Sequence, residues 1–326
     1  MLELDFYSSH EGELTLVDDQ AALVVRAREI ARSSNRLAVE FLLKRIGTRV
    51  PATKDEAYFG EALNYLCGIV YGHAGMASEA ADAIAASNVL PHSGGDMLFH
   101  DAVAAGVEAA SKQDEAIARG VPPILIASMP RSASAALTQT LAMITGAPLF
   151  RISVGAFPNY CIVPTWLGRF LRGGAVLHDH FGASEFNMSL LVKHQVRVVN
   201  LLVRDPRAAA VSFAKHVFGK SDVHVERMYS MYLLWLNDWL RAEKANGINI
   251  RWIRSSDVIS GRDGLMTAVS TVLGNQSQYA FPDQLADANF SGQESDAWRD
   301  IVPSDVQEEM WDLMPPEIIE RLELRR

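Results

Sequence analysis

Residues 124–137, Ile-Leu-Ile-Ala-Ser-Met-Pro-Arg-Ser-Ala-Ser-Ala-Ala-Leu, predict the fold of this chain most directly. The first four residues form a short apolar run, which is typical of a buried strand. Small and hydroxyl-bearing residues follow, and the pattern from Ser132 to about Thr145 is helical. A strand that turns sharply into a helix is the basic unit of a parallel α/β fold.

Strand-like and helix-like segments continue to alternate after this unit. The run at 196–203 (VRVVNLLV) is the most strand-like, and further strands are predicted at 174–178 and 248–253. Helices are predicted at 132–145, 184–194, 206–217, 222–245 and 262–273. The alternation predicts a central parallel sheet covered by helices on both faces. Because ligands bind beyond the carboxyl ends of the strands in such sheets, we expect functional motifs directly after strands.

The first 120 residues have a different character, with many Ala and Glu residues and apolar positions at helical spacing. Helical patterns cover about 24–46, 56–70, 78–87 and 97–119. The spacings Gly68-x-x-Tyr71 and Ala80-x-x-x-Ile84 resemble a tetratricopeptide repeat. A stable array needs about three repeats and one copy is present, so an ordinary helical hairpin is the alternative. We therefore predict an all-α domain at 1–120 and an α/β domain at 121–326.

The turn after the first strand carries the donors that an anion needs. Its residues are Pro130, Arg131, Ser132, Ala133, Ser134 and Ala135. Backbone N–H groups at a helix start lack partners, and the helix dipole favours negative charge there. Ser132 and Ser134 add hydroxyl groups, and Arg131 adds a fixed cation. The turn predicts a phosphate or sulfate cradle, and the alternative is a serine-capped helix. It lacks the GxxxxGK[ST] signature of nucleoside triphosphatases.

A second candidate anion contact follows the strand at 196–203. The sequence there reads Arg204-Asp205-Pro206, and Ser212 comes eight residues after Arg204. Pro206 suits the first turn of a helix, where its missing N–H needs no partner. Arg204 at the strand end and Ser212 about two turns along the helix could then face one anion. The alternative is a surface ion pair between Arg204 and Asp205 beside a solvated serine.

Together these motifs resemble sulfotransferases that use 3′-phosphoadenosine 5′-phosphosulfate (PAPS). The run SMPRSASAAL is similar to their 5′-phosphosulfate loop, roughly Pro-Lys/Arg-Ser-Gly-Thr-Thr, with Ala133 in place of the Gly and Ala135 in place of the second Thr. If that Gly position requires a positive φ, Ala133 costs about 1 kcal/mol or more. The second motif is similar to their Arg-Asn/Asp-Pro-Arg/Lys-Asp-x-x-x-Ser segment, which implies that Arg204 and Ser212 hold the 3′-phosphate.

The resemblance covers about residues 122–326 and implies the P-loop-like sulfotransferase fold, with a parallel sheet flanked by helices. A weaker likeness lies near the C-terminus, where the family often has Arg-Lys-Gly followed by Trp. Here Gly292 and Trp298 remain and the Arg-Lys pair is missing. Gly292 and Trp298 are therefore candidate nucleotide contacts. The alternative is a surface loop anchored by one tryptophan.

Sulfuryl transfer needs a general base for the acceptor, and histidine titrates near neutral pH. His178 and His180 flank Asp179 at a predicted strand end, so both imidazoles should point to one face of the strand and Asp179 to the other. The resemblance implies that His180 is the base and that His178 takes the position of a family lysine. Arg131 would serve the leaving group. The alternatives are histidines that cap a strand, or a His-x-His metal contact, for which no third ligand is nearby in the sequence.

Composition limits the partners that we expect. The chain of 326 residues has 30 Lys and Arg against 39 Asp and Glu, a net charge of −9, so it has no general attraction for nucleic acid or anionic membranes. Cys67 and Cys161 form neither a CxxC pair nor a zinc spacing, which favours reduced thiols in the cytoplasm. We see no signal-peptide pattern and no apolar stretch near the ~20 residues that span a bilayer. The expectation is a cytoplasmic protein without membrane insertion.

The sequence thus predicts a PAPS-dependent sulfotransferase that modifies a hydroxyl or amine of a small-molecule acceptor and needs no metal. Aromatic residues at 150–172 and 228–239 are interpreted as core, or as an acceptor pocket or adenine stack. One alternative is a decayed nucleotide-binding scaffold on the same fold, and another is a kinase with an atypical loop. The N-terminal helices are a candidate surface for a homodimer or a protein partner.

Overall fold

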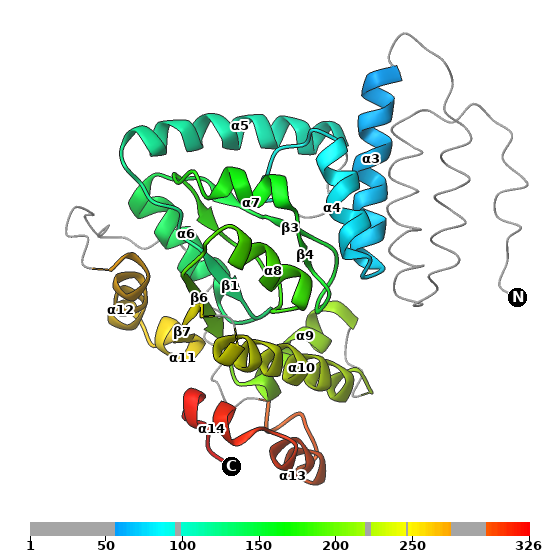
Figure 1. The fold of residues 1–326 in the computed structure, drawn as a ribbon. Coiled ribbons are helices and arrows are strands. Elements are labelled where there is room, and N and C mark those ends of the chain that lie inside the picture. The colour runs from blue at the N-terminus through cyan, green and yellow to red at the C-terminus, as the bar shows by residue number, and fades with distance from the viewer. Residues whose placement is uncertain (1–55, 95–98, 219–222, 246, 275–297) are drawn as a thin grey trace, which may run out of the picture.

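A computed structural model describes residues 56–94, 99–218, 223–245, 247–274 and 298–326 (Figure 1). The helices are α3 (Glu56–His73), α4 (Ala77–Ala86), α5 (Phe99–Ala118), α6 (Ser134–Thr145), α7 (Pro164–Phe170), α8 (Glu185–Lys193), α9 (Pro206–Phe218), α10 (Val223–Ala245), α11 (Ser255–Ile259), α12 (Arg262–Leu273), α13 (Ser304–Asp312) and α14 (Pro316–Leu322). The strands are β1 (Ile126–Ser128), β2 (Leu149–Phe150), β3 (Ser153–Val154), β4 (Cys161–Ile162), β5 (Val176–Leu177), β6 (Val198–Val203) and β7 (Asn249–Arg254).

The strands at the centre of the molecule run parallel in the order β2-β5-β1-β6-β7. β6 pairs with β1 on one side and with β7 on the other, and β2 pairs with β5. Parallel bridges from Ile124 to Val176 and from Ala127 to Asp179 join these two groups. β3 and β4 form a separate antiparallel pair. The α/β class with a parallel sheet, predicted from the alternating pattern, is confirmed.

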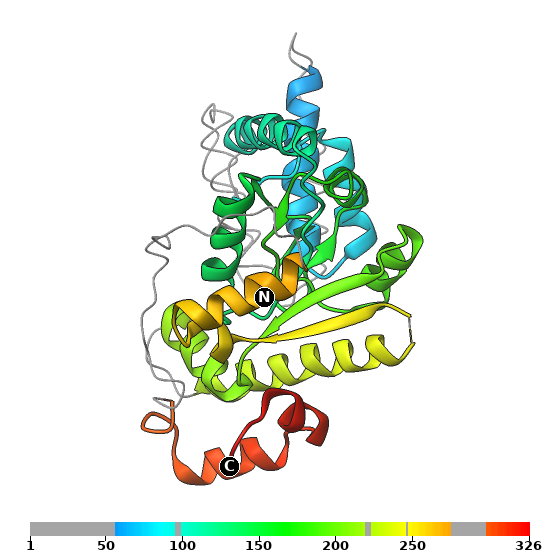
Figure 2. The ribbon, with the colours of Figure 1, turned by 90° about the vertical axis from the view of Figure 1, so that its left-hand side faces the viewer.

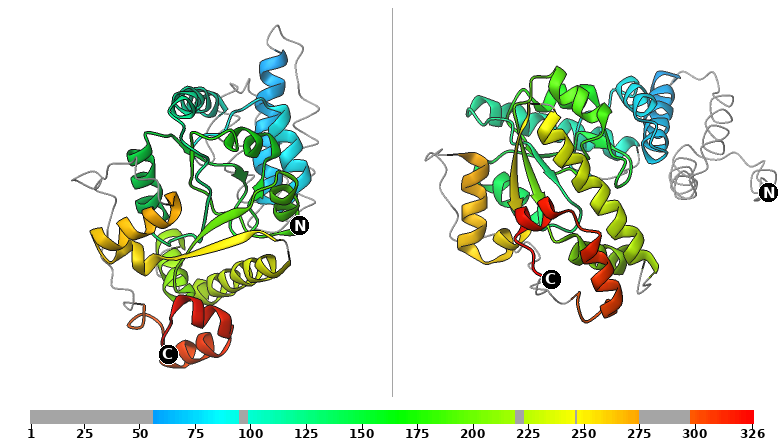
Figure 3. Two further views of the ribbon diagram at one scale, coloured as in Figure 1. Left: turned by 60° about the vertical axis from the view of Figure 1, so that its left-hand side comes forward. Right: turned by 60° about the horizontal axis from the view of Figure 1, so that its bottom comes forward.

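Helices cover both faces of this sheet. Along β6, Val199, Leu201 and Val203 pack into the core that includes α8, α9 and α10, whereas Leu202 packs into the core of α6, α11 and α12. This alternation follows the two-residue period of a strand. Burial on both faces explains why 196–203 is so apolar. Figures 2 and 3 show α10 on one side of β6 and β7 and α12 on the other.

The strands and helices predicted for the α/β part are all present, with ends shifted by one to a few residues. The elements that were not predicted are β2, β3, β4, α7, α11, α13 and α14. The three unpredicted strands are two residues long, so they carry no two-residue alternation that a sequence pattern could show. Pairing with distant strands, rather than local propensity, makes these residues extended.

The N-terminal helices α3, α4 and α5 confirm the helical patterns at 56–70, 78–87 and 97–119, while the pattern at 24–46 lies outside the described residues. These helices share their core with the α/β part. The indole N–H of Trp166 donates to the Val89 carbonyl at 2.6 Å, and the Gln113 amide donates to the Gly173 carbonyl at 2.7 Å. The apolar core is therefore continuous across residue 120, and the division into two domains there stays a prediction.

The crossing of α3 and α4 depends on Gly68. A Cβ added to Gly68 would lie 2.5 Å from Cγ1 of Ile84 and 3.1 Å from its backbone nitrogen. This contact matches the small-against-large arrangement expected for paired helices.

We therefore expect Gly68→Ala to lower the free energy of unfolding by about 1–2 kcal/mol, because overpacking outweighs the better helix propensity of alanine. Gly60, on the same helix, meets no described atom within 4 Å of an added Cβ, so Gly60→Ala is the matched control. It should be neutral or stabilise by up to about 1 kcal/mol. Urea unfolding of both variants measures the difference, and equal values for the two would contradict this account of the crossing.

Candidate functional site

The residues singled out by the motifs lie at one edge of the sheet, where the parallel strands end. The loop 129–133 follows β1, His178 and His180 follow β5, and Arg204 follows β6. Arg151 follows β2, and no sequence motif pointed to it. Because β2, β5, β1 and β6 are neighbours in this order, these residues form a row across the carboxyl edge.

The loop after β1 bends through two left-handed residues. Arg131 has φ = 67° and Ala133 has φ = 63°. The expected requirement for positive φ at the position where the related motif has Gly is therefore confirmed, and Ala133 bears the strain. Backbone N–H groups of residues 133–136 make no hydrogen bond to a described residue, since they precede the first helical bond, which Leu137 donates to the Ala133 carbonyl.

Replacing Ala133 by glycine should relieve this strain. The left-handed conformation costs an alanine about 1–2 kcal/mol, and glycine gives back part of that gain as unfolded-chain entropy. We expect Ala133→Gly to raise the free energy of unfolding by about 0.5–1 kcal/mol. Ala135→Gly, two residues on and inside α6, should instead lower it by up to about 1 kcal/mol. Denaturant midpoints of the two variants test this, and destabilisation by both would mean that the turn does not need glycine-like geometry.

Two arginines and a serine from the two motifs meet beside this loop. Nε of Arg131 donates to Oγ of Ser212 at 3.1 Å, and Nη1 of Arg204 donates to the Arg131 carbonyl at 3.1 Å. Neither arginine forms an ion pair with a carboxylate of the described residues. Burial is the main cause that lowers the pKa of Arg204; the negative charge of the neighbouring Asp205 opposes this effect, and the positive charge of Arg131 adds to it. Two cations are thus held together, and no carboxylate of the described residues lies within ion-pair distance of either guanidinium.

Asp205 does not pair with Arg204 in the described structure. It binds Arg207, whose Nε and Nη2 donate to its carboxylate at 3.0 and 2.8 Å. Arg207 is 2% exposed, and its guanidinium lies 4.7 Å from the Trp298 ring centre. Trp298 itself is 3% exposed, so its ring packs inside the protein against Arg207. Gly292, the other candidate of the C-terminal segment, lies outside the described residues.

His180 has hydrogen bonds that determine its tautomer. Its Nδ1 lies 2.8 Å from the Ser128 carbonyl oxygen, which can only accept, so Nδ1 carries the proton. The Ser128 hydroxyl, 3.0 Å from the same nitrogen, donates to the Asp179 carbonyl. Nε2 has no hydrogen-bond partner among the described residues. Burial, followed by the charge of His178, lowers the pKa of His180 to about 4, so the ring is neutral at pH 7 with a free lone pair.

His178 lies beside His180, with ring centres 5.7 Å apart, as expected for alternate residues of one strand. Its Nε2 is 3.0 Å from Oγ of Ser134, the first residue of α6. Burial is the main cause that lowers the pKa of His178. His178 therefore contacts the start of α6 directly. The contact is made through Ser134, one of the two serines whose hydroxyl groups were expected to bind an anion.

Asp179 points away from the two imidazoles and is fully buried. Its Oδ2 accepts from the backbone N–H groups of Ile152 and Ser153 at 2.8 and 2.9 Å. Its Oδ1 accepts from the Ser153 hydroxyl at 2.5 Å and from the N–H of His180 at 2.8 Å. The carboxylate thus anchors the histidine segment to the loop after β2. Nothing in the sequence pattern except its place between the histidines indicated this role.

Other residues around the loop are structural. The Tyr232 hydroxyl donates to the Pro130 carbonyl at 3.1 Å, which ties the loop 129–133 to α10. Trp235 and Trp239 are 1% and 0% exposed, which confirms the interpretation of 228–239 as core.

Ser132 is fully buried, and its Oγ has no partner among the described residues, so this hydroxyl is available inside the loop.

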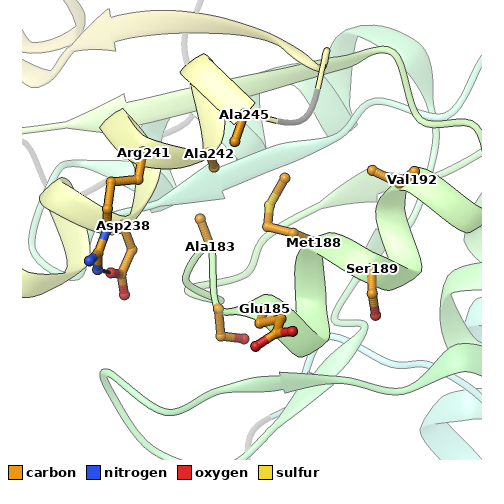
Figure 4. A pocket seen from close by; sticks show the side chains of 10 residues that line it. Ala183, Glu185, Met188, Ser189, Val192, Asp238, Arg241, Ala242 and Ala245 are labelled. Carbon is orange, nitrogen blue, oxygen red and sulfur yellow. Dashed lines mark hydrogen bonds and ion pairs between the residues drawn. The ribbon is translucent and has the colours of Figure 1, made fainter.

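A separate pocket of about 550 Å³ lies between α8 and α10 (Figure 4). Ala183, Met188 and Ala242 form part of its apolar wall, and Glu185, Asp238 and Arg241 lie at its polar side. Neither the loop 129–133 nor either histidine lines it. The chemistry-bearing residues therefore belong to the sheet edge and not to this pocket.

Comparisons with protein-family models, with curated proteins and with solved structures found no significant match to the chain. Among the described residues, no group of three or more His, Cys, Asp or Glu side chains could hold a metal ion, and no helix is long and apolar enough to cross a membrane. Cys67 and Cys161 are free thiols. Evidence about function therefore comes from the fold and from the side chains at the carboxyl edge of its sheet.

Proposed function

We propose that this protein is a sulfotransferase that moves the sulfuryl group of PAPS to a hydroxyl, or an amine, of a small molecule. The observation that carries the proposal is the meeting of Arg131, Arg204 and Ser212 beside backbone N–H groups that bind no described residue, with no described carboxylate in ion-pair contact with either arginine. Two cations held together without a direct ion pair favour a ligand with several negative charges. A nucleotide with a phosphate at one end and a phosphosulfate at the other meets that demand.

The row of residues divides into a donor side and an acceptor side. On the donor side, Arg204 and Ser212 would hold the 3′-phosphate, and the N–H groups at the start of α6 would hold the 5′-phosphosulfate. The guanidinium of Arg131 donates to Ser212, so it also lies near the predicted 3′-phosphate position. Both anionic ends of the nucleotide would then meet positive charge or backbone N–H donors.

His180 provides the proton acceptor. Its Nε2 would take the proton of the acceptor hydroxyl as that oxygen forms its bond to sulfur. The bond between sulfur and the bridging oxygen of the 5′-phosphate breaks in the same step, and the new negative charge on the phosphate falls on the loop N–H groups and Arg131. The bound polyanion would raise the pKa of His180 from its low value in the free protein, because a neighbouring negative charge favours the imidazolium.

Calorimetry and a transfer assay test the proposal together. We expect 3′-phosphoadenosine 5′-phosphate to bind at micromolar concentration or below, and ATP with magnesium to bind far more weakly. Labelled sulfate from PAPS should then appear on a phenol or alcohol in a panel of small acceptors. Preference for ATP with magnesium would favour the kinase alternative, and nucleotide binding without transfer to any acceptor would favour the scaffold.

A further inference from the structure

The pocket between α8 and α10 lies outside the proposed transfer site and has the size of a site for a small organic ligand. Its volume is about 550 Å³, and ligand sites in proteins occupy about 300–1,000 Å³. α8 forms one side of the pocket and α10 the other (Figure 4). Because no residue of the row at the sheet edge lines it, a ligand bound here would not occupy the place of the nucleotide.

The wall of this pocket is apolar and contains small side chains. The Met188 side chain extends from α8 toward Ala242 and Ala245 of α10, where the alanine side chains leave space (Figure 4). Met188 is 4% exposed, whereas Val192, one helical turn further along α8, is 48% exposed. A flexible thioether beside an exposed valine forms an adaptable apolar surface. A ligand with an apolar body would cover this surface and remove Val192 from water.

Glu185 is the charged group of the pocket that binds no described residue. The two serine hydroxyls of the pocket, those of Ser184 and Ser189, form hydrogen bonds with backbone groups of α8. Arg241 forms an ion pair with Asp238. Glu185 is exposed and forms neither a hydrogen bond nor an ion pair within the described parts of the chain. Two carboxylates against one guanidinium leave the lining with one negative charge in excess.

The helix ends at the pocket also favour a cation. α8 begins at Glu185, so the positive end of its dipole stabilises the ionised carboxylate of that residue. α10 ends at Ala245, so the negative end of its dipole lies at the pocket. A cation would therefore meet a carboxylate on the α8 side and a helix carboxyl end on the α10 side. An anion would be repelled by both.

We propose that this pocket binds a small organic cation, an amine with an apolar body, whose ammonium group lies on the Glu185 carboxylate and whose body lies against Met188. The proposal goes beyond sulfuryl transfer and does not depend on it. The charge of Glu185 selects the cation, and the apolar wall provides contact area for the body. A metal ion fits less well, because no three His, Cys, Asp or Glu side chains gather to hold one among the described residues.

Three ligands of one shape test the proposal by calorimetry with the full-length protein and no nucleotide. They are 4-phenylbutylamine, 4-phenylbutanol and 4-phenylbutyrate, which are cationic, neutral and anionic at pH 7. We expect the amine to bind about three- to tenfold more tightly than the alcohol, and the carboxylate to bind most weakly. The advantage of the amine should shrink at molar salt, whereas binding of the alcohol should not weaken.

Three variants locate the binding. Glu185→Gln should reduce the affinity for the amine to that for the alcohol. Glu226→Gln is the matched control, because Glu226 is also an exposed glutamate in the first turn of a helix and does not line the pocket. Ala245→Phe should weaken amine and alcohol alike, since Ala245 is exposed and a larger side chain there fills the pocket without entering the core. Thermal unfolding checks that each variant keeps the fold.

The outcomes separate this proposal from sulfuryl transfer. Equal affinity of wild type for amine and alcohol, the same preference for the amine in Glu185→Gln, or no binding of either ligand would overturn it. Methyl resonances of labelled methionines give a second readout: the Met188 signal, assigned with Met188→Leu, should shift as the amine binds, and binding that leaves it unmoved would also overturn the proposal. Binding of the amine at Glu185 in a protein that transfers no sulfate would support this site and count against the transferase alone.

Discussion

His180→Gln is expected to lower kcat for sulfuryl transfer by about 100- to 10,000-fold, the contribution of a general base, and to leave nucleotide binding within about threefold of wild type. A glutamine amide can still donate to the Ser128 carbonyl, as Nδ1 does now, so the strand end should keep its shape. It has no basic nitrogen to replace Nε2. The measurement is kcat with PAPS and an active acceptor, alongside calorimetry with 3′-phosphoadenosine 5′-phosphate.

His194→Gln is the matched control, because His194 is the C-cap residue that follows α8 and lies outside the row of site residues. It should retain wild-type kcat. His178→Gln separates the two histidines: we expect a smaller loss, since His178 supports the loop through Ser134. Near-normal turnover of His180→Gln would refute His180 as the base, and a larger loss in His178→Gln would assign that role to His178.

The low pKa of His180 determines how activity and stability should change with pH. The pKa of His180 in the free protein is about 4, below its ordinary value of 6.5. It is therefore neutral and able to accept a proton at pH 7, and kcat/KM for PAPS, which reports the free protein, should stay flat on the acid side until about pH 5 and fall below pH 4. Between pH 6.5 and 4 the unfolded chain binds more protons at this site, so stability falls as the pH drops through that window. His180→Gln should remove this part of the slope, and an unchanged slope would contradict a buried neutral imidazole.

Arg204→Ala is expected to weaken binding of 3′-phosphoadenosine 5′-phosphate by about 100-fold, because a charge-assisted contact to phosphate is lost in a partly buried place. Binding of adenosine 5′-phosphate, which has no 3′-phosphate, should change far less. The ratio of the two dissociation constants is the decisive measurement. Arg172→Ala is the control, since Arg172 is exposed and pairs with Asp114.

Arg204 also donates to the carbonyl of Arg131, so its loss could act through the loop instead. The two explanations give different results. If Arg204 holds the 3′-phosphate, only the nucleotide with that group loses affinity. If Arg204 mainly holds the loop in shape, both nucleotides lose affinity by the same factor, and the assignment to the 3′-phosphate is wrong. Thermal unfolding of the variant shows whether the fold itself has changed.

The shape of the loop bears on the scaffold alternative. Ala133 bears on this alternative, because the motif that the loop resembles has glycine there. In the structure Ala133 adopts the left-handed conformation that the position requires. The strain costs about 1–2 kcal/mol, which a core of this size can offset. Alanine is therefore compatible with the turn, and its presence gives little support to the scaffold alternative.

Much of the α/β fold followed from local patterns. The run at 196–203 was predictable as a strand because burial on both faces demands nearly continuous apolar residues. The turn at Pro130–Ser134 was predictable because small residues and a proline end a strand, and a serine starts a helix. The short strands β2 to β4 were not predictable, since two residues carry no period and only their partners make them extended.

The sequence by itself determined that the candidate site residues follow strands, because strand ends and helix starts are local features of the chain. Only the tertiary structure decided which of them meet. The strand order places Arg151 on the far side of the histidines. The packing of loops and helices brings Arg131 to Ser212, pairs Asp205 with Arg207, and buries Trp298. Except for the pair Asp205–Arg207, these contacts join residues far apart in the chain, and they depend on the register between strands and on helix packing. Local sequence patterns show neither the strand register nor the helix packing. Which residues lie side by side in the candidate site is therefore known only from the folded structure.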